Sequence, residues 1–230
     1  IEGAVLSLRK IKPLEIIKED QQGVLIRAGA GLALKRFIDF SAEKGFSGIE
    51  GLSGIPGQIG GAIAGNAGAF GYEIKDALTE VTLMDMDGGL KTVSSGELHF
   101  GYRESHIPTG STIVEAVFRL KKDDAVSVSE RVDNFLKEKR QRQPIGQKSA
   151  GCVFKNPKEG LSAGKLIDEA GLKGMRVGDI EVSGVHANFF INTGKGNAGD
   201  FIRLIESVSS EVKKRTGVIL EPEIRIIGIC

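Results

Sequence analysis

The sequence predicts an α+β fold, and three observations support this prediction. Strand-like runs and amphipathic helical segments mix without the regular strand–helix–strand repeat of a parallel, doubly wound sheet. Asp87-Gly88-Gly89 separates two β-rich runs, which is typical of an antiparallel hairpin. The chain has 230 residues, of which 40% are hydrophobic, so it can form one large domain or two modest ones. We place a boundary between domains near Pro144.

The elements of the first half follow from hydrophobic spacing. Residues 4–8 (AVLSL) and 24–28 (VLIRA) have the composition of strands. A helix follows the second run, because Leu34, Phe37, Ile38 and Ala42 recur at steps of three and four residues. The hairpin comes next, and "STIVEAVFRLKK" predicts a further strand after it.

The second half begins with the helical segment "SVSERVDNFLKEKRQRQ". Ser127 and Ser129 are candidate N-caps, and basic residues gather at the C-terminal end, where they suit the helix dipole. Pro144 ends this helix. Four later segments predict a short helix, a β-rich region, a longer helix and a last strand: "SAGKLIDEAG", "IEVSGVHANFFIN", "NAGDFIRLIESVSSEVKKRTG" and "VILEPEIRIIG".

Charge and cysteine content exclude several classes of protein. Thirty-one Lys and Arg against thirty Asp and Glu give a net charge of +1, which does not favour a nucleic-acid-binding protein. No apolar run is long enough to cross a membrane, and no charged leader precedes the first strand. Cys152 and Cys230 are far apart and form a poor disulfide framework, so we expect a reducing, cytoplasmic location. The spacing of cysteines and histidines does not favour a metal site.

Two glycine-containing motifs of nucleotide-binding proteins fit poorly. Gly29-Ala30-Gly31 follows a strand and precedes a helix, but Leu34 replaces the third glycine of the dinucleotide fingerprint. No strand-end acid follows about 20 residues later, so a plain strand-to-helix turn is favoured. The phosphate loop of nucleotide hydrolases is absent, because no Gly-Lys-Ser or Gly-Lys-Thr follows a glycine run.

The most informative segment is "GLSGIPGQIGGAIAGNAGAFG", residues 51–71. It has eight glycines and no charged side chain, in a chain whose residues are 27% charged. Ordering so much glycine is entropically costly, so the backbone must approach something bulky or remain disordered. Small side chains let a backbone lie against a flat ring system and direct N–H groups at phosphates. Close helix packing in an apolar core is the alternative explanation.

Three further segments carry candidate reactive groups. "FGYRES" places Arg103 beside Tyr102, and "SAGCVFKNP" presents Cys152 in a turn of small residues. "LEPEIRIIG" carries Glu221 and Glu223, which strand alternation would direct to one face. Each segment alone also has an ordinary interpretation: a surface ion pair, a buried thiol or a solvated strand face.

Together these segments resemble, in the same order, those of the UDP-N-acetylenolpyruvoylglucosamine reductases, flavoenzymes of bacterial peptidoglycan synthesis. The resemblance extends from about Glu2 to Gly228. It implies an FAD-binding domain of the PCMH/vanillyl-alcohol-oxidase-like type and an α+β C-terminal substrate domain. The implied division is a last strand of an N-terminal FAD subdomain (1–10), a middle FAD-binding domain (11–142), a substrate domain (143–217) and a return strand (218–230).

The resemblance also implies the reaction, in which NADPH reduces an enolpyruvyl UDP-sugar through FAD. Arg103 would bind the substrate carboxylate, Glu223 would assist there, and Cys152 would donate a proton to the α-carbon. Most family members carry serine at the position of Cys152, and a thiol is the stronger acid. FAD would lie against the glycine-rich segment, at Pro56, Gly57, Gly60, Gly61, Asn66, Gly68, Ala69 and Gly71.

Further positions are implied for the UDP-sugar: Tyr102, Arg142, Lys155, Asn156, His186 and Asn188. The short link between Arg103 and Arg142 is similar to that of the subgroup without a tyrosine-bearing clamp loop. The Gly-Ser-Asn loop of the family's N-terminal subdomain has no counterpart here, so we expect the sequence to begin inside that subdomain.

These interpretations leave two alternatives to the reductase: another FAD-linked oxidoreductase of the same fold, and a non-catalytic fragment that binds a UDP-sugar. We expect Arg103, Cys152 and Glu223 to converge in one cleft beside the glycine-rich segment. We expect no metal, no nucleic acid, no membrane and no obligate protein partner.

Overall fold

A computed structural model describes residues 5–157 and 160–228, which form two compact units. The first unit is Val5–Glu138, and the second comprises the described residues from Lys139 onward. Each has a hydrophobic core of its own. The four-part division predicted from the sequence stays a prediction.

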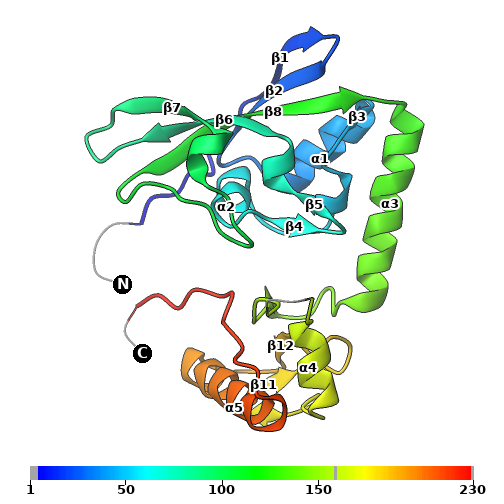
Figure 1. Ribbon diagram of the computed structural model, residues 1–230, viewed down its shortest axis with the longest axis vertical. Coiled ribbons are helices and arrows are strands. Elements are labelled where there is room, and N and C mark those ends of the chain that lie inside the picture. The colour runs from blue at the N-terminus through cyan, green and yellow to red at the C-terminus, as the bar shows by residue number, and fades with distance from the viewer. Residues whose placement is uncertain (1–4, 158–159, 229–230) are drawn as a thin grey trace. The chain divides into compact units, whose positions relative to one another are not determined.

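The first unit is built on an antiparallel sheet with the strand order β1-β2-β8-β6-β7, and β3 pairs with the far end of β8 (Figure 1). Its strands and helices are β1 (Leu14–Asp20), β2 (Gly23–Gly29), α1 (Leu34–Glu43), β3 (Phe46–Ser47), η1 (Glu50–Leu52), α2 (Ile59–Ala64), β4 (Gly68–Ala69), β5 (Tyr72–Glu73), η2 (Ile74–Asp76), β6 (Leu78–Met84), β7 (Leu90–Ser94), η3 (Ser95–Leu98) and β8 (Thr112–Lys122). α3 (Ala125–Arg142) follows and contains the boundary between the units.

The core of this unit lies between the sheet and α1. Alternate residues of β2, namely Val24, Ile26 and Ala28, are fully buried, as period-two alternation requires. From α1, Phe37 packs on Phe118 of β8 with ring centroids 4.8 Å apart. This contact joins the apolar stripe of the helix to the central strand of the sheet.

The second unit contains a four-stranded antiparallel sheet with the order β10-β11-β12-β9, together with two helices. Its elements are β9 (Ser149–Cys152), α4 (Ala163–Glu169), β10 (Arg176–Val177), β11 (Ile180–Val182), β12 (Phe189–Asn192) and α5 (Ala198–Thr216). Asn197 and Asp200 form a capping box at the start of α5, and Gly217 ends the helix in the left-handed conformation. Leu204, Val208 and Val212 bury one face of α5 in the core.

The structure confirms the α+β class and most predicted elements. The strand at 24–28, the helix from Leu34, the hairpin around Gly88, the strand of β8 and the later helices are all present. These are the long or strongly periodic segments of the sequence, in which spacing reports burial directly.

The first and last predicted strands are wrong as far as the structure describes them. Residues 5–8 form no strand, and the described part of "VILEPEIRIIG" makes only a single bridge, Phe154 to Pro222. A strand requires a neighbour to accept its hydrogen bonds, and these residues have none beyond that bridge in the described chain. Several of their apolar side chains are exposed, by 79% at Val5 and 74% at Ile227, whereas Leu220 is buried in the core of the second unit. The remaining residues of both predictions, including Cys230, lie outside the described ranges.

Two local predictions also need correction. Neither Ser127 nor Ser129 is the N-cap of α3, because the helix begins at Ala125 and Asp124 accepts hydrogen bonds from the Ser127 backbone N–H and hydroxyl, at 2.8 and 3.0 Å. Aspartate and serine are equally good N-cap residues, and Asp124 is the one that directly precedes the first residue of the helix. Sequence analysis also missed β1, whose side chains are almost all exposed and lack an apolar face.

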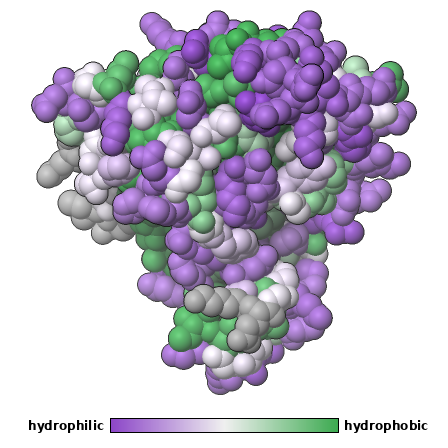
Figure 2. Space-filling view, turned by 45° about the horizontal axis from the view of Figure 1, so that its top comes forward, coloured by the Kyte–Doolittle hydropathy of each residue, from purple (hydrophilic) through white to green (hydrophobic). Residues whose placement is uncertain are grey.

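Hydrophilic side chains cover most of the face shown in Figure 2, with hydrophobic patches between them. Within the described residues, no helix is both long and apolar enough to span a membrane.

Candidate functional site

The glycine-rich segment is ordered, and it packs against the turn between β2 and α1. The Ile59 and Gly60 backbone N–H groups donate to the carbonyls of Leu32 and Ala30, each at 2.9 Å. The Leu34 N–H donates in return to the Gly57 carbonyl, at 3.0 Å. The Gly29-Ala30-Gly31 turn therefore supports this segment.

Some glycines of the segment are required by packing inside the protein. A Cβ at Gly60 would lie 3.0 Å from the Cβ of Ala30, and one at Gly68 would lie 2.8 Å from the Tyr72 carbonyl oxygen. At Gly51 a Cβ would meet the Tyr72 ring at 2.3 Å. Close packing, the alternative explanation, therefore accounts for these three positions.

Other glycines face open space. Added Cβ atoms at Gly57, Gly61 and Gly71 would meet no heavy atom of the described chain within 4 Å. Gly57 and Gly71 have positive φ values of 122° and 80°, which favour glycine for conformational reasons. Gly61 is helical, so neither its backbone nor its neighbours require glycine. We call the open space beside Gly61 the open strip. A ring system that approaches the backbone closely would need such a space.

Asn66 supplies a second sign of a ligand in the glycine-rich segment. Its side chain is fully buried, and its Nδ2 donates to the Gly101 carbonyl at 2.8 Å and to Glu73 Oε2 at 3.2 Å. Its Oδ1 is buried without a hydrogen-bond partner in the described part of the chain. Buried acceptors are rarely left unsatisfied, so a donor from a ligand or water fits here. The residues of this segment thus suit a large cofactor such as FAD.

Arg103 lies beside the same segment within the first unit. Its guanidinium Nη2 donates to the Gly68 carbonyl at 2.7 Å, and its Cζ is 4.9 Å from the centre of the Tyr102 ring. Its φ of 59° is unusual for a residue other than glycine, and such strain is commonly found at functional sites. Ser105 adds a hydrogen bond to the Ala64 carbonyl, at 3.0 Å. The turn at 101–105 is thus joined to the glycine-rich segment.

In the second unit, Cys152 and Glu223 come close along the backbone. Cys152 ends β9 and is half-buried, and the Glu223 backbone N–H donates to the carbonyl of Val153 at 2.8 Å. Glu221 is exposed on the other side of Pro222, and its carboxylate pairs with Lys155 at 2.6 Å. That the two acids lie on one face stays a prediction.

The Asn188 side chain hydrogen-bonds to the backbone just after β9. Its Oδ1 accepts from the Phe154 N–H at 2.9 Å, and its Nδ2 donates to the Phe154 carbonyl at 2.8 Å. The side chain is buried, so these bonds fix the backbone next to Cys152. Asn156 accepts a hydrogen bond from the Ala163 N–H, at 3.0 Å, at the start of α4.

His186 packs against Phe189, with ring centroids 5.0 Å apart, and its Nδ1 accepts from the Asn188 N–H at 3.2 Å. A Cβ at Gly164 would lie 3.0 Å from the His186 ring, so this glycine makes room for it. Burial lowers the pKa of His186 from its ordinary value of 6.5, and the nearby Lys173 charge adds to this effect. His186 is consequently neutral at physiological pH and suits a hydrogen-bonding role.

The structure brings together two sets of predicted residues, one in each unit. Asn66, Gly68 and Arg103 form the first set, and Cys152 and Glu223 the second. Arg142 is an exposed residue at the end of α3. A hollow of about 440 Å³ in the second unit has Lys148, Ser183 and Thr193 in its lining, and none of the predicted substrate residues lines it.

Sequence analysis missed Glu50, which borders the glycine-rich segment. Its side chain is only 1% exposed and it pairs with Arg131 at 2.9 Å. The available signal was a single carboxylate at the edge of an uncharged stretch of 21 residues, where a charge requires a partner. No group of three or more His, Cys, Asp or Glu side chains suited to a metal is found in the described ranges.

Comparisons with known proteins identify relatives of this chain. The family described as UDP-N-acetylenolpyruvoylglucosamine reductase, C-terminal domain, matches residues 143–227, and the FAD binding domain family matches residues 1–94. A reductase of that name from Pelobacter propionicus is 42% identical over 228 residues, which cover 99% of this chain and 75% of the relative. One from Agathobacter rectalis is 44% identical over 237 residues, with coverage of 99% and 75%.

A solved structure is also similar. The UDP-N-acetylenolpyruvylglucosamine reductase from Thermus caldophilus matches with a TM-score of 0.78 and 40% identity. The match covers 90% of this chain and 73% of the solved chain.

Proposed function

This chain belongs to the UDP-N-acetylenolpyruvoylglucosamine reductase family, and from that membership we infer that it reduces UDP-N-acetylglucosamine enolpyruvate to UDP-N-acetylmuramate with FAD and NADPH. The observation that carries this inference is a similarity to reductases of about 40% identity along 99% of the chain. The open strip at Gly61 and the unsatisfied Asn66 oxygen support FAD as the cofactor.

The chemistry sets requirements for the protein. The glycine-rich segment would hold FAD, which would supply a hydride for the β-carbon of the enolpyruvyl group with NADPH as the reductant. Negative charge then develops at the α-carbon and spreads into the carboxylate. The protein must stabilise that charge and deliver a proton to the α-carbon.

We propose that Arg103, Glu223 and Cys152 meet these requirements. Arg103 binds the substrate carboxylate with its planar fork of donors, and Glu223 assists at the same carboxylate. Cys152 donates its proton to the α-carbon, leaving a thiolate that is reprotonated from solvent. The hydrogen bond from Arg103 to Gly68 supports this role, because it fixes the guanidinium at the edge of the glycine-rich segment.

For the UDP-sugar, we propose contacts from Tyr102, Arg142, Lys155, Asn156, His186 and Asn188. Three of these residues differ in the other interactions that they make. Asn188 also holds the backbone at Phe154, whereas His186 offers a neutral ring. Lys155 is already paired with Glu221, so binding of a phosphate there would compete with a carboxylate.

The product is a peptidoglycan precursor, so we place the enzyme upstream of cell-wall assembly and, through it, of cell shape and division. We propose a cytoplasmic location, where reducing conditions keep the Cys152 thiol available.

The deciding experiment measures NADPH oxidation by the purified, FAD-supplemented protein with and without the enolpyruvyl UDP-sugar. We expect bound flavin absorbance, and NADPH oxidation that depends on the UDP-sugar. Flavin binding without that dependence would instead indicate another oxidoreductase of this fold. Binding of the UDP-sugar without any flavin would indicate a non-catalytic binding fragment.

A further inference from the structure

One face of α3 contacts both ends of the glycine-rich segment. Arg131 and Phe135 are four residues apart, so they lie on the same side of the helix, one turn from each other. Arg131 reaches Glu50, just before the segment, and Phe135 contacts the aromatic residues at its far end. All of these residues belong to the first unit.

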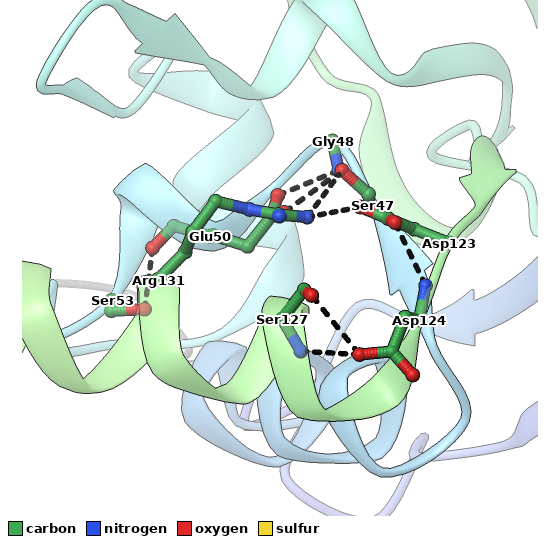
Figure 3. A network of polar contacts seen from close by, with 8 residues as sticks. All are labelled: Ser47, Gly48, Glu50, Ser53, Asp123, Asp124, Ser127 and Arg131. Atoms are coloured by element: carbon green, nitrogen blue, oxygen red, sulfur yellow. Dashed lines mark hydrogen bonds and ion pairs between the residues drawn. The ribbon is translucent and has the colours of Figure 1, made fainter.

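The contact at the near end is a network of polar groups around the buried Glu50 carboxylate (Figure 3). Arg131 donates to Glu50 Oε1 from Nε at 3.0 Å and from Nη2 at 2.9 Å. The Ser47 hydroxyl donates to Oε1 at 2.8 Å, and the Gly48 N–H donates to Oε2 at 2.6 Å. Arg131 also pairs with Asp123, which precedes the helix.

These hydrogen bonds affect the pKa of Glu50 more than the desolvation of its carboxylate does. Burial alone would raise the pKa of Glu50, but hydrogen bonds from the Gly48 backbone, Ser47 and Arg131 hold it below its ordinary value of 4.5. Glu50 is therefore ionised at neutral pH and remains bound to Arg131. Ser53, inside the segment, is tied to the same residue because its hydroxyl donates to the Glu50 carbonyl at 2.5 Å.

The contact at the far end is aromatic. Phe135 stacks on Phe70 with ring centroids 4.8 Å apart and meets Tyr72 edge-on at 5.7 Å. Phe70 has a φ of 53°, an unusual conformation that needs support from its surroundings. Tyr72 in turn fills the space beside Gly51, so the two ends of the segment lie against each other.

We propose that this face of α3, Arg131 with Phe135, is a clamp that holds the glycine-rich segment in its cofactor-binding conformation. The proposal rests on the proposed function, since it treats the segment as the FAD site. Arg131, Glu50 and Phe135 are positioning residues, because none of them lies among the residues proposed to touch FAD or substrate. A segment with eight glycines has many alternative conformations, and the clamp restricts them at both ends before the cofactor binds.

Arg131→Gln tests the clamp, and Arg119→Gln is the matched control. Arg119 lies in the same unit, pairs with Asp20 at 3.3 Å and is 31% exposed, against 36% for Arg131. Hydrogen–deuterium exchange of the FAD-free proteins should show amides of 48–53 and 68–73 exchanging about tenfold faster in Arg131→Gln. The same peptides should exchange at the wild-type rate in Arg119→Gln. Equal rates in the two variants would overturn the clamp.

FAD affinity gives the functional readout. If the binding-competent conformation falls to about a tenth of the population, the apparent Kd for FAD rises about tenfold in Arg131→Gln. Arg119→Gln should change it by less than about twofold, even where the two variants lose equal stability. Phe135→Leu, which keeps an apolar side chain, should weaken FAD binding in the same direction. Unchanged Kd values in both clamp variants would refute the proposal.

The two readouts separate this proposal from the proposed function. A wild-type protein that binds no FAD would contradict the function, while the exchange rates would still decide whether the clamp exists.

Discussion

Substitution of Cys152 is the most direct test of the proposed chemistry. A thiol is a stronger acid than the hydroxyl that most family members carry at this position, so it can supply the proton that the α-carbon requires. The two residues after Cys152 are held in place, Phe154 by the Asn188 amide and Val153 by the Glu223 N–H. A positioned proton donor benefits from such support, because general acid catalysis depends on geometry before acidity.

Replacing Cys152 with alanine should separate the two halves of the reaction. Flavin reduction by NADPH should keep nearly its wild-type rate, since it involves no proton transfer to the substrate's α-carbon. Reoxidation by the enolpyruvyl UDP-sugar should slow by about 10²–10⁴-fold, the usual contribution of a general acid. Stopped-flow absorbance of the flavin measures both rates. Cys152→Ser is the matched control and should retain much of the activity, because a hydroxyl can also donate.

The opposite result is equally informative. If Cys152→Ala reoxidises at the wild-type rate and only loses stability, the thiol is a packing residue of β9, and the proton comes from elsewhere.

At the scale of elements, the two glycines of α2 have different reasons to be glycine: one serves packing inside the protein, and the other leaves room for a ligand. Gly60 faces Ala30 and is required by the protein, whereas Gly61 faces open space. The helix is therefore less stable than it could be, because glycine in a helix costs about 0.5–1 kcal/mol relative to alanine.

Gly61→Ala should consequently have opposite effects on stability and on cofactor binding. In the FAD-free protein, the free energy of unfolding should rise by about 0.5–1 kcal/mol, as measured by urea denaturation. The Kd for FAD should rise, because the new methyl group occupies the open strip. Gly60→Ala is the control, and it should lose stability through its contact with Ala30. A Gly61→Ala protein that binds FAD as tightly as wild type would place the cofactor elsewhere.

For the whole molecule, the two separate cores predict two unfolding transitions. The chain has no tryptophan, and its only tyrosines, Tyr72 and Tyr102, both lie in the first unit. Tyrosine fluorescence therefore reports the first unit alone, whereas far-ultraviolet circular dichroism reports helices and strands of both. Non-coincident curves from these probes would show that unfolding is not two-state.

Matched core substitutions sharpen this prediction. Leu204→Ala in α5 should cost about 2–5 kcal/mol and shift the dichroism curve without moving the tyrosine curve. Leu120→Ala in β8, equally buried, should shift the tyrosine curve. Identical shifts of both curves in both variants would mean that the two units unfold together.

The sequence predicted well wherever a signal was local. Periodic spacing identified α1, α5, β2 and β8, because burial of one face dictates which residues along the segment are apolar. Residues 5–8 and 218–228 show the limit of this rule. They have the composition of strands, but a strand forms only beside a partner strand, and composition does not report that partner.

Sequence alone therefore determined the α+β class, most elements, the unusual character of residues 51–71 and, through ordered motifs, the family. Only the tertiary structure decided which glycines serve packing and which leave room, because that depends on neighbours such as Ala30 and Tyr72. It also decided that Glu50 meets Arg131, 81 residues away, and that Asn66 reaches Gly101, 35 residues away. Such contacts arise from chain folding in space, and no short stretch of sequence encodes both partners.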